Sequence, residues 1–282
     1  MMDSNTVLFG VIGDPIRHSK SPIMLNRAFK EKGINCAYAA FHVAPNQLEQ
    51  AIAGVRGLGF RGLNVTIPHK IEVMALLDEL SEGAKAAGAV NTIVNENGRL
   101  VGYNTDGIGY VRSLKEEIEP SLTGKTIIVL GAGGAARGII WALAQENPAA
   151  IIIANRTESK ASELAASFSL AGKVTSIPWS DLQEACKQAD VVINTTSVGM
   201  SPNIEKVPLD PSWLRIGSVA SDLIYNPLKT EFLKQAELQG CRIHGGLGMF
   251  IYQGAYAFEY WTGQPAPVEE MRAVVMESLS IK

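Results

Sequence analysis

The chain has 282 residues, which is long enough for two domains with separate hydrophobic cores. Its hydrophobic content of 46% and charged content of 19% are typical of a globular protein and exclude a disordered or fibrous one. The formal net charge of −3 and the absence of a long apolar stretch give no indication of nucleic-acid binding or of a membrane-spanning helix.

The first half of the chain alternates predicted strands and helices. Ser21 followed by Pro22 marks a helix start, because serine is a favoured N-cap and proline suits the first turn. A turn at 95–98 between two short apolar runs predicts a β-hairpin. From periodicity we predict strands at 7–12, 37–43, 63–67, 92–94 and 100–101, and helices at 21–33, 48–55 and 70–77.

The second half repeats the same alternation after a predicted connecting helix at 107–118. Proline and glycine between 119 and 124 break the chain before the next strand. Successive strand–helix units predict mostly parallel sheets in both halves. We predict strands at 126–130, 149–154, 190–194, 219–223 and 241–244, and helices at 135–146, 158–167, 228–238, 249–261 and 268–279.

A glycine-rich turn at 131–136 joins the strand at 126–130 to the helix that follows it. Gly131 permits the tight turn, Gly133 lets backbone N–H groups approach a pyrophosphate, and Ala136 is small enough for close helix–strand packing. The pattern predicts a dinucleotide-binding turn, although glycine-rich turns also occur for purely structural reasons.

The residues after the next strand favour one dinucleotide over the other. The carboxylate that would bind the ribose 2′-OH of NAD is absent, and Asn155 and Arg156 stand there instead. A carboxylate would repel a 2′-phosphate, whereas a guanidinium can bind it. The sequence therefore predicts NADP(H).

Three polar clusters in the first half could carry chemistry. Ser19 and Ser21 lie at a predicted helix start, where the positive helix end favours a small anion such as a carboxylate. Lys70 follows a strand that ends in polar residues, and ligands of α/β sheets bind beyond such strand ends. Asn91 and Asp106 bracket the hairpin. The alternatives are helix capping, an exposed lysine and ordinary turn chemistry.

Further polar segments follow strands in the second half, at 194–200, 222–227 and 245–253. The first of these suits contacts to the nicotinamide side of a cofactor. Gln253 lies on a helix face rich in aromatic residues and alanine, where a buried amide needs a partner. The four histidines form no metal-binding pair, and three scattered cysteines are typical of a reducing compartment. We therefore predict no metal site and a cytoplasmic location.

In this order, from residue 13 to Gly263, these segments resemble the NADP-dependent shikimate dehydrogenase family. The motifs that carry the resemblance lie at 18–22, 64–70, 88–92, 104–107, 131–136, 155–157, 194–200 and 246–253. One departure is Leu25, which precedes Asn26 where the family often has histidine; the position looks peripheral.

The resemblance implies an α/β chain with two domains. Residues 1–106 would form the substrate-binding catalytic domain, with C-terminal helices in 246–282 packing back on it. Residues 107–245 would form a Rossmann-like, doubly wound NADP-binding domain. The implied reaction is the reversible NADP-dependent reduction of 3-dehydroshikimate to shikimate, on the route to chorismate and aromatic amino acids. The implied partner is this small molecule, and we expect a monomer or a homodimer.

The resemblance also implies a role for individual residues. Lys70 would be the acid/base, and Asp106 would orient Lys70 and the substrate hydroxyls. The predicted substrate-binding residues are Ser19 and Ser21 for the carboxylate, and Thr66, Asn91, Tyr225 and Gln253 for the hydroxyls or ring. The predicted cofactor-binding residues are Gly131, Ala132, Gly133, Gly134, Ala135, Asn155, Arg156, Thr157, Lys160, Leu223 and Gly246.

Two alternatives remain open at this point. One is a quinate/shikimate dehydrogenase of broader specificity, because quinate differs by one added hydroxyl on the carbon that bears the carboxylate. The other is a non-catalytic, NADP-sensing regulatory module on the same scaffold. The presence of both Lys70 and Asp106 counts against the second.

Overall fold

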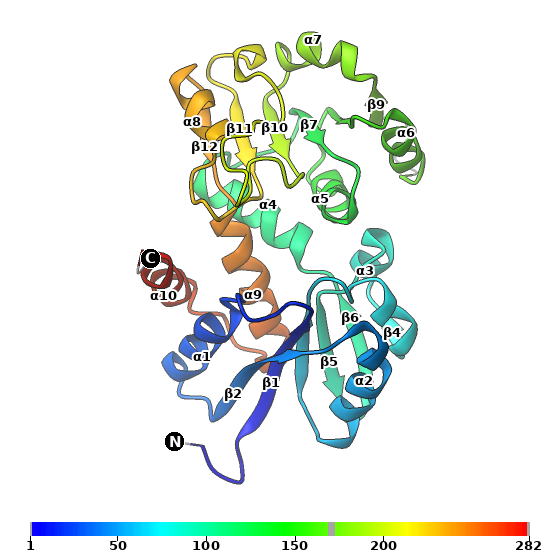
Figure 1. Ribbon diagram of the computed structural model, residues 1–282, viewed down its shortest axis with the longest axis vertical. Helices are drawn as coiled ribbons and strands as arrows, with labels where there is room; N and C mark the ends of the chain where they lie inside the picture. The colour runs from blue at the N-terminus through cyan, green and yellow to red at the C-terminus, as the bar shows by residue number, and fades with distance from the viewer. Residues whose placement is uncertain (1, 169–172, 281–282) are drawn as a thin grey trace. The chain divides into compact units, whose positions relative to one another are not determined.

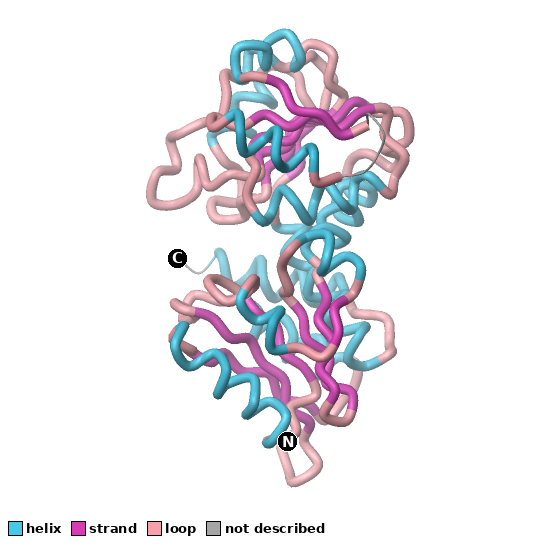
Figure 2. Tube along the Cα trace, turned by 90° about the vertical axis from the view of Figure 1, so that its right-hand side faces the viewer, coloured by secondary structure: helices cyan, strands magenta, loops and turns pink. Residues whose placement is uncertain are grey.

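The computed structural model describes residues 2–168 and 173–280. The chain divides into two compact units: unit 1 comprises Met1–Gly109 and Ile251–Lys282, and unit 2 comprises Tyr110–Phe250. Both boundaries fall inside helices, α4 (Asp106–Glu117) and α9 (Leu247–Thr262). The strands of each unit form a sheet of their own, with helices outside it (Figures 1 and 2). Among the described residues, no helix is both long enough and apolar enough to cross a membrane.

The sheet of unit 1 has the order β2-β1-β3-β5-β6-β4. Strand β1 pairs in parallel with β2 and β3, and the predicted hairpin is confirmed as the antiparallel pair β5–β6. Strand β4, which the sequence analysis missed, pairs with β6. The strands are β1 (Val7–Gly13), β2 (Cys36–His42), β3 (Gly62–Val65), β4 (Glu79–Leu80), β5 (Thr92–Glu96) and β6 (Arg99–Tyr103).

The helices of unit 1 include one that the sequence analysis missed, α3. Helix α1 packs against α10, far from it in the sequence. Buried aliphatic side chains of β1, β3, β5 and α2 form a shared core. Besides parts of α4 and α9, the helices are α1 (Ser21–Glu31), α2 (Leu48–Gly57), α3 (Glu82–Ala87) and α10 (Val268–Ser280), with 3₁₀ turns at Pro45–Gln47 and Glu72–Leu76.

The α-helix predicted at 70–77 is wrong. Only the 3₁₀ turn Glu72–Leu76 forms there, and it buries only Val73, so no apolar stripe anchors a longer helix. The carbonyl of Lys70 accepts a hydrogen bond from Val90 N at 2.8 Å instead of from the next helical turn. Lys70 therefore lies in a turn that is tied to the segment before β5.

The predicted N-cap role of Ser21 is also wrong. Ser21 is the first helical residue of α1, and Lys20 occupies the N-cap position without a capping side-chain bond. The Ser19 hydroxyl accepts a hydrogen bond from Ser21 N at 3.3 Å. Proline at position 22 suits the first turn as predicted, because its missing N–H is not needed there.

Strand β2 is the outer strand of its sheet, and a side chain of α1 covers part of its edge. Asn26 Nδ2 donates to Tyr38 O at 2.8 Å, and Asn26 Oδ1 accepts from Tyr38 N at 2.9 Å. The amide thereby pairs with both outward backbone groups of Tyr38, as a neighbouring strand would.

The sheet of unit 2 has the order β12-β11-β10-β7-β8-β9, and every pair in it is parallel. Counted within the unit, this is the doubly wound order 3-2-1-4-5-6 read from β9 to β12, which confirms the predicted Rossmann-like fold. The strands are β7 (Thr126–Leu130), β8 (Ala150–Ala154), β9 (Val174–Ile177), β10 (Val191–Asn194), β11 (Val219–Asp222) and β12 (Arg242–His244).

The helices of unit 2 begin and end close to the predicted positions, but α7 and the strand β9 were missed. Strand β9 lies at the edge of the sheet and fully buries only Val174, so its sequence lacks a clear apolar period. Besides parts of α4 and α9, the helices are α5 (Gly134–Ala144), α6 (Glu158–Ala166), α7 (Leu182–Cys186) and α8 (Glu231–Leu238), with 3₁₀ turns at Trp179–Asp181 and Pro211–Trp213.

Candidate active site

Lys70 and Asp106 form an ion pair in unit 1, with 2.6 Å between Lys70 Nζ and Asp106 Oδ2. Their side chains are 28% and 17% exposed, so both can be reached by a ligand. Asp106 is the first residue of α4, where the helix dipole favours a negative charge. An ammonium has three N–H donors, so two remain for a ligand after the bond to Asp106. The pair can therefore bind a hydroxyl or carbonyl and exchange a proton with it.

The Asn91 amide holds the other oxygen of this carboxylate. Asn91 Nδ2 donates to Asp106 Oδ1 and to Thr105 Oγ1, both at 2.9 Å, and Asn91 Oδ1 accepts from Thr105 N at 2.8 Å. Both amide hydrogens are thus donated within the protein. Asn91 orients Asp106, while its predicted contact with a substrate hydroxyl remains a prediction.

A buried polar network lies beneath Asn91. Asn64 Nδ2 donates to Asn91 O and to Thr92 Oγ1 at 3.1 Å, and Asn64 Oδ1 accepts from the Tyr38 hydroxyl at 2.7 Å. Burial raises the pKa of Tyr38 well above its ordinary value, and a hydrogen bond with the Ser21 hydroxyl lowers it in part. The network thus links Tyr38 of β2 to the Asn91–Asp106 group.

The predicted carboxylate-binding residues lie at the start of α1. Ser21 is buried and Ser19 is half-buried. The Ser21 N–H is donated to Ser19, so fewer backbone donors are available here than the sequence suggested. Thr66 follows β3, and its methyl group fills the space left by Gly13, where an added Cβ would lie 2.5 Å away. These residues share the carboxyl edge of the sheet at β1 and β3, where ligands of such sheets bind.

Gln253 lies on α9 within unit 1 and is half-buried. Its backbone carbonyl oxygen, Gln253 O, accepts a hydrogen bond from Thr105 Oγ1 at 3.0 Å. Helix α4 reaches the same point, because a Cβ on Gly109 would lie 2.7 Å from Gln253 N. The structure therefore brings Gln253 to the group that contains Asn91 and Asp106.

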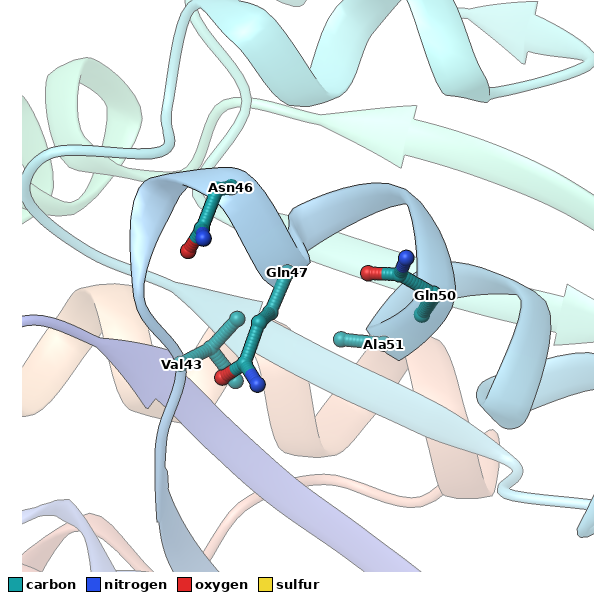
Figure 3. A pocket seen from close by; sticks show the side chains of 5 residues that line it. All are labelled: Val43, Asn46, Gln47, Gln50 and Ala51. Atoms are coloured by element: carbon teal, nitrogen blue, oxygen red, sulfur yellow. The ribbon is translucent and has the colours of Figure 1, made fainter.

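A hollow of about 560 Å³ lies beside Val43 in unit 1 and is lined by the amides of Asn46, Gln47 and Gln50 (Figure 3). The sequence analysis did not single out these residues. Among its lining residues the hollow has no ionisable side chain, so we assign it no role in catalysis. One lining residue of the hollow, Val43, is nevertheless connected to the Lys70 turn. Val43 O lies 2.7 Å from Nε2 of buried His69, the residue before Lys70.

In unit 2 the predicted dinucleotide turn begins with Gly131, at the point where the strand order reverses between β7 and β10. Gly131 has φ +112°, and a Cβ there would lie 2.7 Å from Thr195 Oγ1. Thr195 donates to Leu130 O at 2.7 Å. Only glycine satisfies both the backbone conformation and the close contact.

The remaining glycines of the turn are open to solvent. Gly133 is the N-cap of α5 without a capping side chain, and Gly134 begins the helix. An added Cβ at either position would meet no atom within 4 Å. The first N–H groups of α5 and its positive end thus face open space, an arrangement that fits a pyrophosphate.

The end of β8 presents two exposed cations, Arg156 and Lys160. Asn155 Nδ2 donates to Thr157 O at 2.8 Å and so shapes the turn between β8 and α6. A guanidinium and an ammonium at this position suit the 2′-phosphate of NADP rather than the ribose hydroxyls of NAD.

Asp222, at the end of β11, is a fully buried carboxyl group to which the sequence analysis gave no role. It accepts hydrogen bonds from Asn194 Nδ2, Ile224 N and Thr230 Oγ1 at 3.2, 3.0 and 2.8 Å. Burial raises the pKa of Asp222 to about 6, although these hydrogen bonds lower it. Asp222 thereby ties the ends of β10 and β11 to the start of α8.

Leu223 and Tyr225, the next predicted site residues in unit 2, follow Asp222 directly. A Cβ on Gly246 would lie 2.0 Å from Leu223 O, so the chain after β12 passes directly over this segment. The Tyr225 ring stacks on Phe250 with 5.0 Å between centroids. The structure therefore groups Leu223, Tyr225 and Gly246.

Comparisons with known proteins identify the family of this chain. Family profiles match at 11–93 ("Shikimate dehydrogenase substrate binding domain"), 113–206 ("Shikimate / quinate 5-dehydrogenase") and 246–276 ("Shikimate 5'-dehydrogenase C-terminal domain"). A curated shikimate dehydrogenase (NADP(+)) from Geobacillus kaustophilus is 50% identical over 96% of this chain and 98% of its own. The chain belongs to the shikimate dehydrogenase family.

Solved shikimate dehydrogenases share the whole fold. One in complex with NADP+ is 44% identical, with a TM-score of 0.91 over 99% of this chain and 97% of that one. Another, from Thermus thermophilus in complex with NADP(H) and shikimate, is 34% identical, with a TM-score of 0.88 over 97% of this chain and 100% of that one. The predicted family membership and fold class are therefore confirmed.

Five residues that organise the candidate sites of the two units were given no role of their own in the sequence analysis: Tyr38, Asn64, Thr105, Asn194 and Asp222. The structure buries all of them. A weak signal for Asn64, Asn194 and Asp222 is a polar residue at the end of an otherwise apolar strand. Tyr38 and Thr105 give no such signal, because tyrosine is common in strands and threonine in turns.

Proposed function

We infer that this chain is an NADP-dependent oxidoreductase that interconverts shikimate and 3-dehydroshikimate, on the route to chorismate and the aromatic amino acids. The observation that carries the inference is the Lys70–Asp106 pair at 2.6 Å, held at the carboxyl edge of a sheet in a member of the shikimate dehydrogenase family. Retention of both charged groups argues against a non-catalytic NADP-sensing module.

Lys70 moves the proton of this reaction. Bound NADPH supplies the hydride. In the reductive direction the Lys70 ammonium donates a proton to the carbonyl oxygen of the substrate and becomes the neutral amine. In the oxidative direction the neutral amine takes the proton of the hydroxyl. Asp106 holds Lys70 through one oxygen, and the remaining lone pairs of its carboxylate can accept a substrate hydroxyl. Asn91 keeps that carboxylate in place.

The substrate carboxylate binds at the start of α1, through the hydroxyls of Ser19 and Ser21. The positive end of α1 lies at these two residues and favours an anion. The hydroxyls and ring of the substrate contact four further residues: Thr66, Asn91, Tyr225 and Gln253.

The cofactor binds along the carboxyl edge of the unit 2 sheet. Gly131, Ala132, Gly133, Gly134 and Ala135 line the cofactor. The N–H of Gly131 is donated to Ala154 O at 2.9 Å, so the backbone N–H groups at the open N-terminus of α5 bind the pyrophosphate. Arg156, supported by Asn155, Thr157 and Lys160, binds the 2′-phosphate. Leu223 and Gly246 also line the cofactor.

These assignments divide the work between two parts of the chain. We propose that residues 1–106, with the helices of 246–282, form the substrate-binding catalytic domain, and that residues 107–245 form the NADP-binding domain. The profile description at 11–93 supports the first assignment, and the doubly wound sheet supports the second. We propose a cytoplasmic monomer or homodimer.

An absorbance assay at the NADPH band tests the function. We expect oxidation of shikimate with NADP+ at a much higher kcat/KM than with NAD+, and little oxidation of quinate. Comparable rates with quinate would support the broader quinate/shikimate activity, which the profile description at 113–206 includes. No turnover of either acid with either cofactor would contradict the function.

A further inference from the structure

Thr105 lies where three segments of unit 1 meet. It stands between β6 and α4, directly before Asp106, and its exposed fraction is 0%. Its backbone N–H donates to Asn91 Oδ1 at 2.8 Å. The comparisons and the sequence motifs give it no function of its own, so its buried hydroxyl needs an explanation.

The hydroxyl of Thr105 connects two predicted substrate-binding residues. The oxygen lies 2.9 Å from Asn91 Nδ2, from which it accepts. Its single proton has three acceptors in range, Gln253 O at 3.0 Å, Asn91 Oδ1 at 3.2 Å and Thr92 Oγ1 at 3.4 Å, and the shortest contact is with Gln253 O. One hydroxyl thus joins the start of β5 to α9.

We propose that Thr105 is a positioning residue, which holds Gln253 on α9 in register with Asn91 and Asp106. The proposal rests on the function proposed above, because it treats Gln253 and Asn91 as substrate ligands. Helix α4 also packs closely against α9 here, because a Cβ on Gly109 would lie 2.7 Å from Gln253 N. Loss of the hydroxyl removes this donor from Gln253 O and leaves one hydrogen of buried Asn91 without this acceptor, and the second loss is the costly one.

The main test compares Thr105→Val, which keeps the shape of the side chain, with Thr105→Ser, which keeps the hydroxyl. A tenfold loss in kcat/KM corresponds to about 1.4 kcal/mol, which is the scale of a lost neutral hydrogen bond. We expect Thr105→Val to raise the KM for shikimate about tenfold and to leave the KM for NADP+ unchanged. Thr105→Ser should restore the shikimate KM to within about threefold of the wild type.

Thr262→Val is the matched control within the same unit. Its hydroxyl also donates to a carbonyl of α9, Phe258 O at 2.7 Å. Thr262→Val should lower the melting temperature without changing the shikimate KM. If Thr105→Val also destabilises the chain but leaves the shikimate KM within twofold of the wild type, Thr105 is merely structural and the proposal is wrong.

A second measurement does not depend on turnover. We expect the Asn91 side-chain amide to exchange its hydrogens with water slowly in the ligand-free wild type and much faster in Thr105→Val, as measured by NMR. Equal exchange in both proteins would contradict the proposed contact. If the wild type oxidises no shikimate, the proposed function is wrong. A large difference in amide exchange between the two proteins would then still support the hydrogen bond from the Asn91 amide to the Thr105 hydroxyl.

Discussion

In both sheets a glycine at the end of the first strand makes room for a threonine that follows a neighbouring strand. In unit 1, Gly13 ends β1 and leaves room for Thr66 after β3; in unit 2, Gly131 follows β7 and leaves room for Thr195 after β10. In each case the missing Cβ lets a threonine close over the end of the first strand, at the point where the strand order reverses. Ligands of open α/β sheets bind at such points.

The two places differ in what they offer a ligand. At the start of α1, one N–H is donated to Ser19 and Pro22 has none, so fewer backbone donors remain and the side chains of Ser19 and Ser21 become the main polar groups. At the start of α5, Gly133 and Gly134 expose backbone instead. One architecture can therefore bind a small acid through side chains and a pyrophosphate through backbone, and the choice depends on the first few residues after the strand.

Asp106 in unit 1 and Asp222 in unit 2 also differ in burial and in hydrogen-bond partners. Asp106 is partly exposed and pairs with a lysine, whereas Asp222 is fully buried and accepts only from neutral donors. The first can exchange contacts with a ligand, and the second holds loops together. Four measurements test these differences.

Lys70→Ala should give the largest effect, because it removes the proton donor from the side-chain site. General acid–base groups contribute about 10²–10⁴-fold, or roughly 3–5 kcal/mol of barrier. We expect kcat to fall within this range, with a much smaller change in the Kd for shikimate. Steady-state kinetics and a binding titration measure the two quantities. Near wild-type kcat with poor binding would make Lys70 a binding residue.

Asp222 should make the stability of the chain fall as pH rises from about 4 to about 6. In this window the folded chain holds a proton that the unfolded chain, with a carboxyl pKa of 3.8, has released. Raising the pH therefore favours the unfolded state. A shift from 3.8 to about 6 corresponds to roughly 3 kcal/mol.

Asp222→Asn isolates this contribution from that of other carboxyl groups. Hydrogen bonds lower the pKa values of Asp78 and Asp210. These two carboxyl groups therefore make stability rise with pH, opposite to the effect of Asp222. We expect the variant to gain up to about 3 kcal/mol relative to the wild type between pH 4 and pH 6.5. Urea denaturation at each pH gives the difference. A constant difference across this range would show that Asp222 does not titrate there.

Gly131→Ala and Gly134→Ala should separate folding from cofactor binding. A Cβ at Gly131 meets Thr195 and requires a positive φ, so we expect a loss of about 2 kcal/mol in the free energy of unfolding. Gly134 begins α5 in open space, so alanine there should leave stability within about 0.5 kcal/mol of the wild type. Its methyl group should nevertheless weaken NADPH binding, as measured by fluorescence titration. Unchanged NADPH affinity would contradict the predicted pyrophosphate contact.

Arg156→Ala should give the smallest effect, because the guanidinium is exposed to solvent. Loss of one exposed charge-assisted contact should raise the KM for NADP+ about tenfold, which is about 1.4 kcal/mol. The weak reaction with NAD+ should be nearly unchanged, since NAD+ lacks the 2′-phosphate. Equal losses with both cofactors would contradict the assignment.

The sequence predicted the elements with strong local patterns. The strand at 126–130 was placed residue for residue, and the helix after the glycine turn begins at Gly134, one residue before its predicted start, because an apolar run and a glycine motif are local signals. The turn that carries Lys70 was misread as a helix, because the partner of its carbonyl, Val90, lies 20 residues away. Thr105 gave no signal for the same reason: its hydroxyl bonds to α9, which is far from it in the sequence.

The contact between Asn26 and Tyr38 affects whether another copy of this chain can add a strand to the sheet of unit 1. The outer strand of a sheet carries unpaired backbone groups onto which a strand of another molecule can add. Residues 36–42 contain no lysine, glutamate or proline that would oppose such addition. The Asn26 amide occupies both outward groups of Tyr38 near the middle of this strand, so an incoming strand cannot pair along its full length. A single side-chain amide thereby protects the β2 edge of this sheet against full-length addition of a strand from another copy, and against the aggregation that would follow.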